Sequence, residues 1–530
     1  MKASFESIAH AFDDICLRHP ENPGLIFDEE TITYQELHQT VTNLAGNLQQ
    51  LGVGKDDRVA IILPNCKEYI FSYFAIFKLG AWAMPVNTRW EADEISHVFD
   101  DAEPCTVILT EQEGVINFLS IIDAIRQRVT YLKQVILVGS PSQSVDYEGV
   151  IEFDALLNAP ETTPRFGDVS LHDVAMLSYT SGTTGQPKGV MISHLNFIET
   201  SVHTAQLWHL TEEVPLSIAP LYAAQGFLAM LIDFIGGGAT MNFVSTFNPN
   251  DILKSISLGR NTALHTQPTM WSLLLASRAI NFANFSSLQK VVVSGSLCSS
   301  HLAHSIQERV GCVLLNAYGL VEATSVVTLT RPEDSLEVRL NTVGRPLPGV
   351  EIKIVDQQRQ PVPKGEVGEL AVKGYLMTGY YKKPEKTSEV IDEDGWLYTG
   401  DMARYYDDEN ISIVGRCKEM IIRGGFNIYP IDIEEVILKH RDVQDVAVVG
   451  RPHDVIGEQT VAFVVPHPGR TVTKNDILNF CQGTIANYKI PDEVIFISQM
   501  PIILSGKVKK TTLGRWAKEG VPRNELFLFE

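Results

Sequence analysis

Short apolar runs alternate with segments of helical spacing through the N-terminal part of the chain. The apolar runs, which predict buried strands, are residues 59–63, 83–87, 174–179, 190–192, 291–294 and 312–315. Apolar positions at helical spacing follow at residues 68–79, 195–205 and 302–310. Strands that alternate with helices are typical of mostly parallel sheets whose faces are covered by helices. The pattern therefore predicts an α/β fold.

Three of these apolar runs end in polar or glycine-bearing turns. The turns are Tyr179–Thr180, Ser294–Gly295 and Asn316–Tyr318. In open α/β sheets, ligands bind outside the carboxyl ends of the strands. We therefore expect all three turns to lie around one site.

The pattern changes after Gly344. Residues 350–355, 368–372 and 411–414 alternate like antiparallel strands, which predicts a small β-rich subdomain at about 344–414. Further on, helices are predicted at 431–439 and 474–485, and strands at 443–450, 460–465 and 493–497. Because 530 residues exceed a single core, we predict a large N-terminal domain, residues 1–416, and a smaller mobile α+β C-terminal domain, residues 417–530.

Composition narrows the class of protein. The net charge of −21, from 43 basic and 64 acidic residues, disfavours nucleic acid as a partner. The cysteines number seven and form no Cys-x-x-Cys pair, which argues against a disulfide framework or a zinc cage. The first residues lack the apolar core of a signal peptide, and charge and glycine interrupt the most apolar region, residues 227–244. We therefore expect a cytoplasmic protein with no membrane span.

The turn after residues 174–179 carries chemistry of its own. Gly182 and Gly185 let the backbone turn tightly around an anion, and Lys188 adds a positive charge suited to a polyphosphate. The hydroxyl donors in this turn are Thr180, Ser181, Thr183 and Thr184. Clusters of Gly, Ser and Thr also form ordinary surface loops, but the strand before this one and the lysine after it favour phosphate binding. The spacing is not that of the ordinary P-loop.

The segment Ser181-Gly-Thr-Thr-Gly-Gln-Pro-Lys-Gly189 resembles the phosphate loop of the adenylate-forming enzymes. That superfamily comprises the acyl- and aryl-CoA synthetases, the adenylation domains of peptide synthetases and the firefly luciferases. The resemblance implies that a carboxylic acid reacts with ATP and Mg²⁺ to give an acyl-adenylate and pyrophosphate. A thiol, from CoA or from a phosphopantetheine arm, then displaces AMP.

Further segments resemble the same superfamily and imply roles for individual residues. Tyr318-Gly-Leu-Val-Glu322 would place Tyr318 on the adenine and Glu322 on Mg²⁺. Asp401 and Arg416 would contact the ribose, and Lys507, in Leu504-Ser-Gly-Lys507, would be the mobile catalytic lysine. The residues expected in catalysis are Lys507, Thr184 and Glu322. The residues expected at the nucleotide are Thr180, Ser181, Gly182, Thr183, Thr184, Gly185, Lys188, Gly295, Ser296, Asn316, Ala317, Tyr318, Asp401, Arg416 and Lys507.

The resemblance also implies a domain rotation. The C-terminal domain would pivot near Lys418 between the two half-reactions. Gly424 and Gly425 would then line the channel for the thiol, where a side chain would obstruct a narrow passage.

The acid pocket departs from the superfamily pattern. Ala223 stands where acyl- and aryl-CoA synthetases usually carry a histidine, and Val321 replaces a threonine beside the α-phosphate. Losing that threonine donor would weaken adenylation by roughly 1–3 kcal/mol. The residues expected at the acid are Tyr222, Ala223, Gln225, Gly226, Phe227, Gly319 and Leu320. Residues 217–227 include no Asp, Lys or Arg, which disfavours an amino acid or a second carboxylate on the substrate and favours a fatty or aromatic acid.

Three functions remain open at this point. The leading hypothesis is an acyl- or aryl-CoA synthetase that acts as a monomer or a homodimer. A stand-alone ligase that loads an acyl carrier protein is the second. A protein that binds these ligands without turnover is the third, and it is prompted by Ala223 and Val321.

Overall fold

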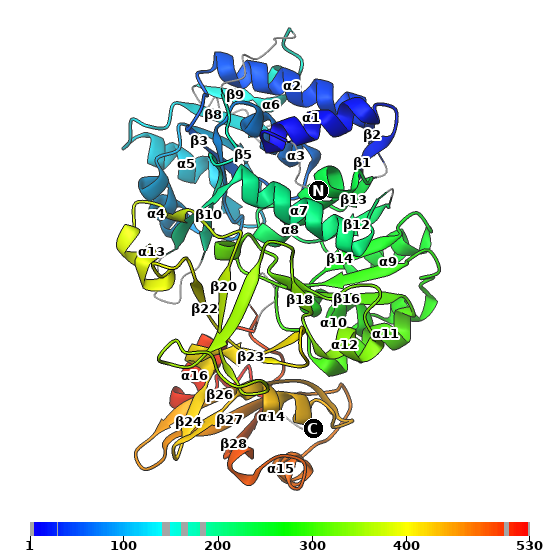
Figure 1. Cartoon of the computed structure of the whole chain (residues 1–530), viewed down its shortest axis with the longest axis vertical. Coiled ribbons are helices and arrows are strands. Elements are labelled where there is room, and N and C mark those ends of the chain that lie inside the picture. Colours follow the sequence, from blue (N-terminus) through cyan, green and yellow to red (C-terminus); the bar gives the residue numbers. More distant parts are fainter. Residues whose placement is uncertain are drawn as a thin grey trace.

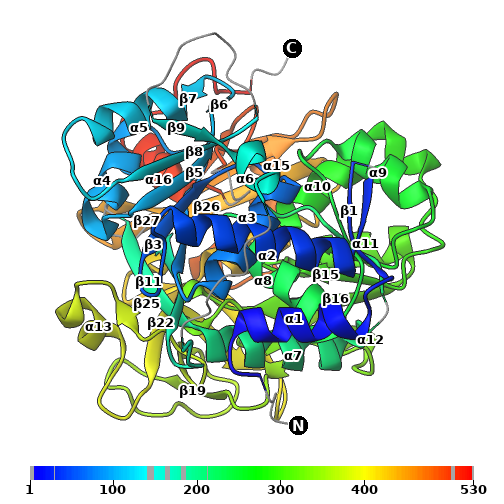
Figure 2. The same ribbon diagram turned by 90° about the horizontal axis from the view of Figure 1, so that it is seen from above.

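The computed structural model describes residues 5–28, 30–139, 149–160, 168–180, 187–211, 213–502 and 508–527. Over these residues it confirms the predicted α/β fold, with large helix-covered sheets and a smaller α+β part at the C-terminal end (Figure 1). The first elements are α1 (Ile8–Arg18), α2 (Tyr34–Gln50) and the antiparallel pair β1 (Pro23–Phe27) and β2 (Glu30–Thr33). Figure 2 shows α1 and α2 side by side across one face.

An eight-stranded sheet within the described residues has the order β21-β11-β10-β4-β3-β5-β8-β9. Its strands are β3 (Arg58–Ile62), β4 (Trp82–Pro85), β5 (Thr106–Thr110), β8 (Gln134–Val138), β9 (Val150–Glu152), β10 (Val174–Thr180), β11 (Lys188–Ser193) and β21 (Gly379–Tyr380). The strands are parallel from β9 to β10, whereas β11 and β21 are antiparallel to their neighbours. The accompanying helices are α3 (Lys67–Lys78), α4 (Ala92–Ala102), α5 (Phe118–Arg126) and α6 (Phe153–Leu157). A short hairpin pairs β6 (Gln112–Glu113) with β7 (Ile116–Asn117).

A nine-stranded sheet within the same described residues has the order β18-β17-β16-β15-β14-β12-β13-β1-β2. Its further strands are β12 (Pro215–Ser217), β13 (Met241–Phe243), β14 (Ala263–Thr266), β15 (Lys290–Val293), β16 (Val313–Tyr318), β17 (Thr328–Leu329) and β18 (Arg345–Pro346). Its helices are α7 (His194–Trp208), α8 (Ala224–Leu231), which continues as the π-helical turn η1 (Ile232–Gly237), α9 (Pro249–Ser257), α10 (Pro268–Ala276), η2 (Arg278–Phe282), α11 (Ser300–Val310) and α12 (Leu336–Asn341). The strands are parallel from β1 to β16, so β12, β14, β15 and β16 present their carboxyl ends at one edge.

A four-stranded antiparallel sheet follows in the described chain and confirms the β-rich texture predicted after Gly344. It joins β19 (Glu351–Val355), β20 (Gly368–Lys373), β22 (Leu397–Tyr405) and β23 (Ile411–Arg416), and α13 (Pro384–Val390) lies beside it. The last part contains β24 (Ile421–Arg423), β25 (Phe426–Ile428), β26 (Val443–His453), β27 (Gly457–Pro466), β28 (Glu493–Phe496), α14 (Pro430–Ile437), α15 (Lys474–Cys481), η5 (Asn487–Lys489) and α16 (Lys510–Glu519). The domain boundary at 416/417, which coincides with the end of β23, stays a prediction.

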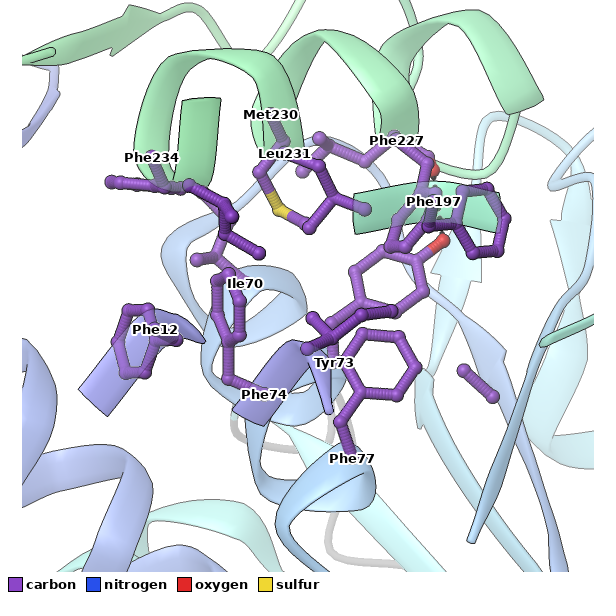
Figure 3. Packing of buried hydrophobic residues seen from close by; sticks show 14 of the residues in the cluster. Phe12, Ile70, Tyr73, Phe74, Phe77, Phe197, Phe227, Met230, Leu231 and Phe234 are labelled. Atoms are coloured by element: carbon purple, nitrogen blue, oxygen red, sulfur yellow. Dashed lines mark hydrogen bonds between the residues drawn. The ribbon is translucent and has the colours of Figure 1, made fainter. Parts of the chain in front are cut away.

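An aromatic core joins the N-terminal helices to α8 and η1 (Figure 3). The ring of Phe12 stacks on Phe74 with centroids 4.0 Å apart, and Tyr73 packs on Phe227 at 4.7 Å. The Tyr73 hydroxyl donates to the carbonyl of Leu221 at 2.9 Å. The core therefore holds the loop in front of α8, where the acid is expected. None of the helices in the described residues is long and apolar enough to cross a membrane.

Polar caps fix where two of the site-bearing helices begin. Ser193 precedes α7, and its side chain accepts from the amide of Asn196; Ser299 does the same for Leu302 before α11. The sequence predicts Ser193 as one cap and either Ser299 or Ser300 as the other, because a hydroxyl satisfies an amide that has no partner within the helix; the structure has Ser299. Gly311 ends α11 in the left-handed region, which glycine adopts readily.

Candidate active site

The phosphate-loop segment connects β10 to β11 in the chain. Thr180, the last residue of β10, is the register partner of Lys188, the first residue of β11. Both ends of the loop are therefore held together by a strand pair. The predicted residues Ser181, Gly182, Thr183, Thr184 and Gly185 lie outside the described residues, as does Lys507.

A tyrosine links the predicted metal ligand to this hairpin. Glu322 lies on the short helical turn η3 (Val321–Ala323), which contacts β11, and its Oε1 accepts from the Tyr380 hydroxyl at 3.0 Å. The Lys188 Nζ lies 4.9 Å from the centroid of the Tyr380 ring. Burial, and then the Glu322 charge, raise the pKa of Tyr380, so its hydroxyl keeps the proton that it donates. A lysine and a carboxylate thus flank one phenol beside the β10–β11 strand pair.

Glu322 is a carboxylate beside the β10–β11 hairpin, and carboxylate oxygen is a ligand that Mg²⁺ takes in proteins. In the part of the chain that the structure describes, no group of three or more His, Cys, Asp or Glu is placed to hold a metal ion. Mg²⁺ commonly binds one or two carboxylates together with substrate phosphates and water. Glu322, held by Tyr380 next to the phosphate-loop hairpin, fits that mode.

Three residues predicted at the nucleotide contact one another directly. Asp401 lies on β22 and is only 5% exposed. Its Oδ2 accepts from the Tyr318 hydroxyl at 2.6 Å, and its Oδ1 lies 2.7 Å from the Nε of Arg416, its register partner on β23. Burial, followed by the Asp401 charge, raises the pKa of Tyr318. The large sheet and the small antiparallel sheet are therefore joined through one buried carboxylate.

A cavity of about 280 Å³ lies beside the ends of β15 and β16. Its lining includes Ser296, Asn316 and Ala317, which were predicted at the nucleotide, together with Asp432 and Glu435 of α14. The Asn316 side chain donates to the carbonyl of Arg339 at 2.7 Å, which ties the end of β16 to α12. A larger hollow of about 590 Å³ opens at the amino ends of β15 and β16. That hollow lies away from the carboxyl edge where ligands of such sheets bind.

The predicted acid segment turns sharply into α8. Ala223 is the N-cap of α8 and has no side chain that could cap the helix. A Cβ at Gly226 would lie 2.2 Å from the carbonyl oxygen of Pro220, so only glycine lets the helix approach this loop so closely. Tyr222 is half-buried before the helix, and burial raises its pKa. Phe227, in contrast, is fully buried in the aromatic core of Figure 3.

The other predicted residues are also placed by close packing. A Cβ at Gly319 would lie 2.0 Å from the carbonyl oxygen of Ser325, so the turn after β16 folds tightly onto its own continuation. Leu320 follows this turn and is partly buried. At Gly295, after β15, a Cβ would lie 2.4 Å from Oε1 of Gln225. Gln225 of the acid segment and Gly295 of the nucleotide segment are thus neighbours.

The loop in front of α8 is anchored by an asparagine from the other large sheet. Asn65 follows β3, and its side-chain amide donates to the carbonyls of Ala219 at 3.2 Å and Val244 at 3.3 Å. Its Oδ1 accepts from the amide of Leu221 at 2.8 Å. One side chain therefore ties the acid segment to the phosphate-loop sheet.

Comparison with known proteins decides the family. Residues 12–381 match the model of the family described as AMP-binding enzyme, and residues 432–507 match that of the AMP-binding enzyme C-terminal domain. The chain belongs to the AMP-binding enzymes. The predicted relation to the adenylate-forming superfamily is confirmed.

Its relatives in this family are similar over nearly the whole chain. The medium-chain acyl-CoA ligase ACSF2, mitochondrial, of Homo sapiens is 30% identical over 96% of this chain and 87% of its own length. The crystal structure of the anthranilate CoA ligase AuaEII in complex with anthranoyl-AMP superposes with a TM-score of 0.90 at 25% identity, over 98% of this chain and 99% of that one. ATP-bound MatB from Rhodopseudomonas palustris gives a TM-score of 0.87 at 28% identity, over 96% and 99% of the two chains.

Two residues that hold the site of this AMP-binding enzyme were missed from the sequence. Asn65 directly follows an apolar run and Pro64, so the rule that strand ends carry sites could have pointed to it. Tyr380 follows Thr378-Gly379 in a region that the pattern assigned to the β-rich subdomain. Tyr380 instead belongs to β21, the edge strand that pairs with β11 in the phosphate-loop sheet. No local sequence pattern indicates this long-range pairing.

The two glycines expected at the thiol channel form the exposed tip of the β24–β25 hairpin. Gly424 and Gly425 have φ values of +57° and +83°, and a Cβ at either would meet no atom within 4 Å. In the structure as it stands, backbone conformation rather than crowding requires glycine here, because a two-residue hairpin turn with positive φ at both positions favours it. Lys418 is exposed on the short turn η4 (Cys417–Glu419), directly after β23.

Proposed function

We propose that this AMP-binding enzyme is an AMP-forming acid–CoA ligase. The observation that carries the proposal is a pair of side-chain groups, one beside the β10–β11 hairpin and one at the end of β16. One is Lys188, Tyr380 and Glu322 beside the phosphate-loop hairpin. The other is Asp401 with Tyr318 and Arg416. The first suits a magnesium-bound triphosphate, and the second suits an adenosine.

In the first half-reaction a carboxylate oxygen of the acid attacks the α-phosphorus of ATP, and pyrophosphate leaves with the electron pair of the broken bond. Lys188 and the phosphate loop would hold the outgoing phosphates, and Glu322 would hold Mg²⁺. Catalysis of this kind rests on positioning and on positive charge, since charge spreads over the phosphate oxygens in the transition state. Lys507 would add a second cation from the C-terminal domain.

In the second half-reaction a thiol attacks the acyl carbonyl, and AMP leaves. A turn of the C-terminal domain near Lys418 would carry the hairpin tip at Gly424 and Gly425 to the site. Its relatives named as acyl-CoA and aryl-CoA ligases support CoA as the acceptor. An acyl carrier protein would present the same phosphopantetheine thiol.

The test is ATP–pyrophosphate exchange with fatty, benzoic and cinnamic acids, followed by thioester formation with CoA or with a loaded carrier protein. We expect exchange with one class of acid and loss of exchange in Lys507→Ala. The exposed neighbour Lys509, changed to Ala, is the matched control and should retain the rate. Nucleotide binding without exchange for any acid would instead support a protein that binds but does not turn over, as the Ala223 and Val321 departures would allow.

A further inference from the structure

Two glutamine side chains meet where α8 begins and where β14 and β15 end. Gln225 is the second residue of α8, and its Nε2 donates to the carbonyl of Thr266 at 3.1 Å and to the hydroxyl of Ser294 at 2.7 Å. The Gln225 Oε1 accepts from Nε2 of Gln267 at 2.8 Å. The two amides therefore form a short chain across the segment where the acid is expected.

The partners of Gln225 fix the orientation of both amides. Its Nε2 faces the carbonyl oxygens of Thr266 and Ser294, and carbonyl oxygens only accept hydrogen bonds. Its Oε1 must therefore face Gln267, which in turn must present its NH₂ group. The Oε1 of Gln267 is left turned away from this contact. Gln267 is only 5% exposed, and this oxygen is buried and accepts no hydrogen bond.

A buried acceptor without a donor lowers the stability of the folded protein, so its presence in a native structure needs an explanation. Gln267 lies directly after β14, and side chains alternate between the faces of a strand. Ala263 belongs to the core cluster that contains Phe227 of α8, whereas Leu264 belongs to the cluster on the opposite face. His265 and Gln267 thus lie on the α8 side.

His265 adds a second unpaired polar atom on the same side of β14. Its Nε2 is buried without a hydrogen-bond partner, and the residue is 4% exposed. Burial lowers the pKa of His265 to about 4, so the imidazole is neutral at physiological pH. Two unpaired polar atoms, Nε2 of His265 on β14 and Oε1 of Gln267 directly after it, therefore lie on the same side of this strand; the His265 ring packs against Trp208 of α7, and the Gln267 side chain contacts Gln225 of α8.

We propose that Gln267, held by Gln225, selects acids that carry a neutral hydrogen-bond donor in addition to their carboxylate. A hydroxyl or an aryl amine would donate to Oε1 of Gln267. An ammonium is disfavoured because residues 217–227 offer no carboxylate to balance it. This inference rests on the proposed function, and it replaces a purely apolar acid by a fatty or aromatic acid with a donor group.

The discrimination follows from the cost of leaving the acceptor empty. A site built to bond a hydroxyl rejects the analogue without it, because the buried partner then stays unpaired. We expect kcat/KM for the preferred donor-bearing acid to exceed that of its unsubstituted counterpart by about 10- to 100-fold, the ratio that corresponds to one unsatisfied buried acceptor. Gln267→Met, which keeps the size of the side chain but removes the acceptor, should reduce this ratio to near one.

The experiment measures ATP–pyrophosphate exchange with matched acids. The pairs are benzoic acid against its hydroxy and amino derivatives, and octanoic acid against hydroxyoctanoic acids. The wild type, Gln267→Met and the exposed control Gln357→Met are compared, and Gln357→Met should behave like the wild type. The proposal is overturned if the wild type exchanges every unsubstituted acid as fast as, or faster than, its hydroxy or amino derivative. This outcome is measured on the wild type alone, so the test does not depend on whether a variant folds.

The outcomes separate this inference from the proposed function. Exchange with a donor-bearing acid, and a ratio that collapses only in Gln267→Met, supports both. Exchange with a ratio unchanged in a folded Gln267→Met overturns the role of Gln267 and leaves the ligase function intact. No exchange with any acid in the wild type overturns the function, and this inference falls with it.

Discussion

A buried ion pair at the amino end of β15 gives a sharp test of how the large sheet is held. The Lys290 Nζ lies 2.7 Å from Oε1 of Glu213 and donates to the carbonyl of His209 at 2.7 Å. The two charged side chains are 10% and 9% exposed. Lys290→Met would leave the Glu213 carboxylate buried and without its cation. Removing one partner of a buried pair destabilises by about 3–5 kcal/mol, or about two to four powers of ten in the unfolding equilibrium.

The double variant Lys290→Met with Glu213→Leu separates this cause from simple loss of packing. With no charge left behind, we expect it to be more stable than Lys290→Met alone, since apolar replacement of a buried pair is often neutral. Urea unfolding, followed by circular dichroism and by tryptophan fluorescence, measures both. Lys364→Met, which breaks an exposed pair with Asp408, should leave the midpoint unchanged. The reasoning is refuted if Lys290→Met costs no more than Lys364→Met, or if the double variant loses the sum of the single losses.

Two further predictions follow from the contacts described above. Tyr380→Phe removes the hydrogen bond to Glu322 and should lower kcat/KM for MgATP by about 10-fold or more, because a bond to a charged group contributes about 1.5–3 kcal/mol. Activity titrated against Mg²⁺ checks this prediction, with Tyr381→Phe as the matched control. An unaltered Mg²⁺ dependence in Tyr380→Phe would contradict it. Burial lowers the pKa of His194 to about 4, so between pH 6.5 and 4 the unfolded chain binds a proton that the folded chain does not, and the free energy of unfolding falls as the pH drops. Between pH 7 and 5 this amounts to about 2 kcal/mol, which urea titrations should find missing in His194→Gln; an equal pH dependence in both proteins would rule the mechanism out.

Local patterns predicted the strand ends that position the site. The runs before Thr180, Ser294 and Asn316 are buried strands because they are short and apolar, and Ser193 and Ser299 cap the next helices, since a cap needs only the residues beside it. The strand β22 was not predicted, although it carries Asp401 in the middle of the small sheet. Its polar residues and Gly400, with a φ of +70°, interrupt the alternation that marks a strand.

Most of the site features that could not be predicted from the sequence depend on contacts between residues distant in the chain. Asn65, Tyr380 and the Gln225–Gln267 pair act through partners distant in the chain, so neither spacing nor propensity indicates them. The antiparallel pairing of β11 also differs from the parallel alternation expected nearby, because the phosphate-loop turn is too short for a crossover helix. The place of Phe227 at the acid stays a prediction, and its packing against Tyr73 and Phe197 in the aromatic core is a long-range contact that the motif does not indicate.

The position of Arg416 bears on how the intermediate is retained between the two half-reactions. Arg416 is the last residue of β23 and is fixed to Asp401, while Lys418, where the family resemblance sets the pivot, follows it on η4. A rotation that starts beyond Arg416 leaves this carboxylate–guanidinium pair untouched. If Asp401 and Arg416 bind the ribose, as the family resemblance implies, the adenylate made in the first half-reaction would keep these contacts while Lys507 departs and the thiol arrives. Retention of the intermediate would thus depend on where the rigid sheet stops, and not on how fast the mobile part moves.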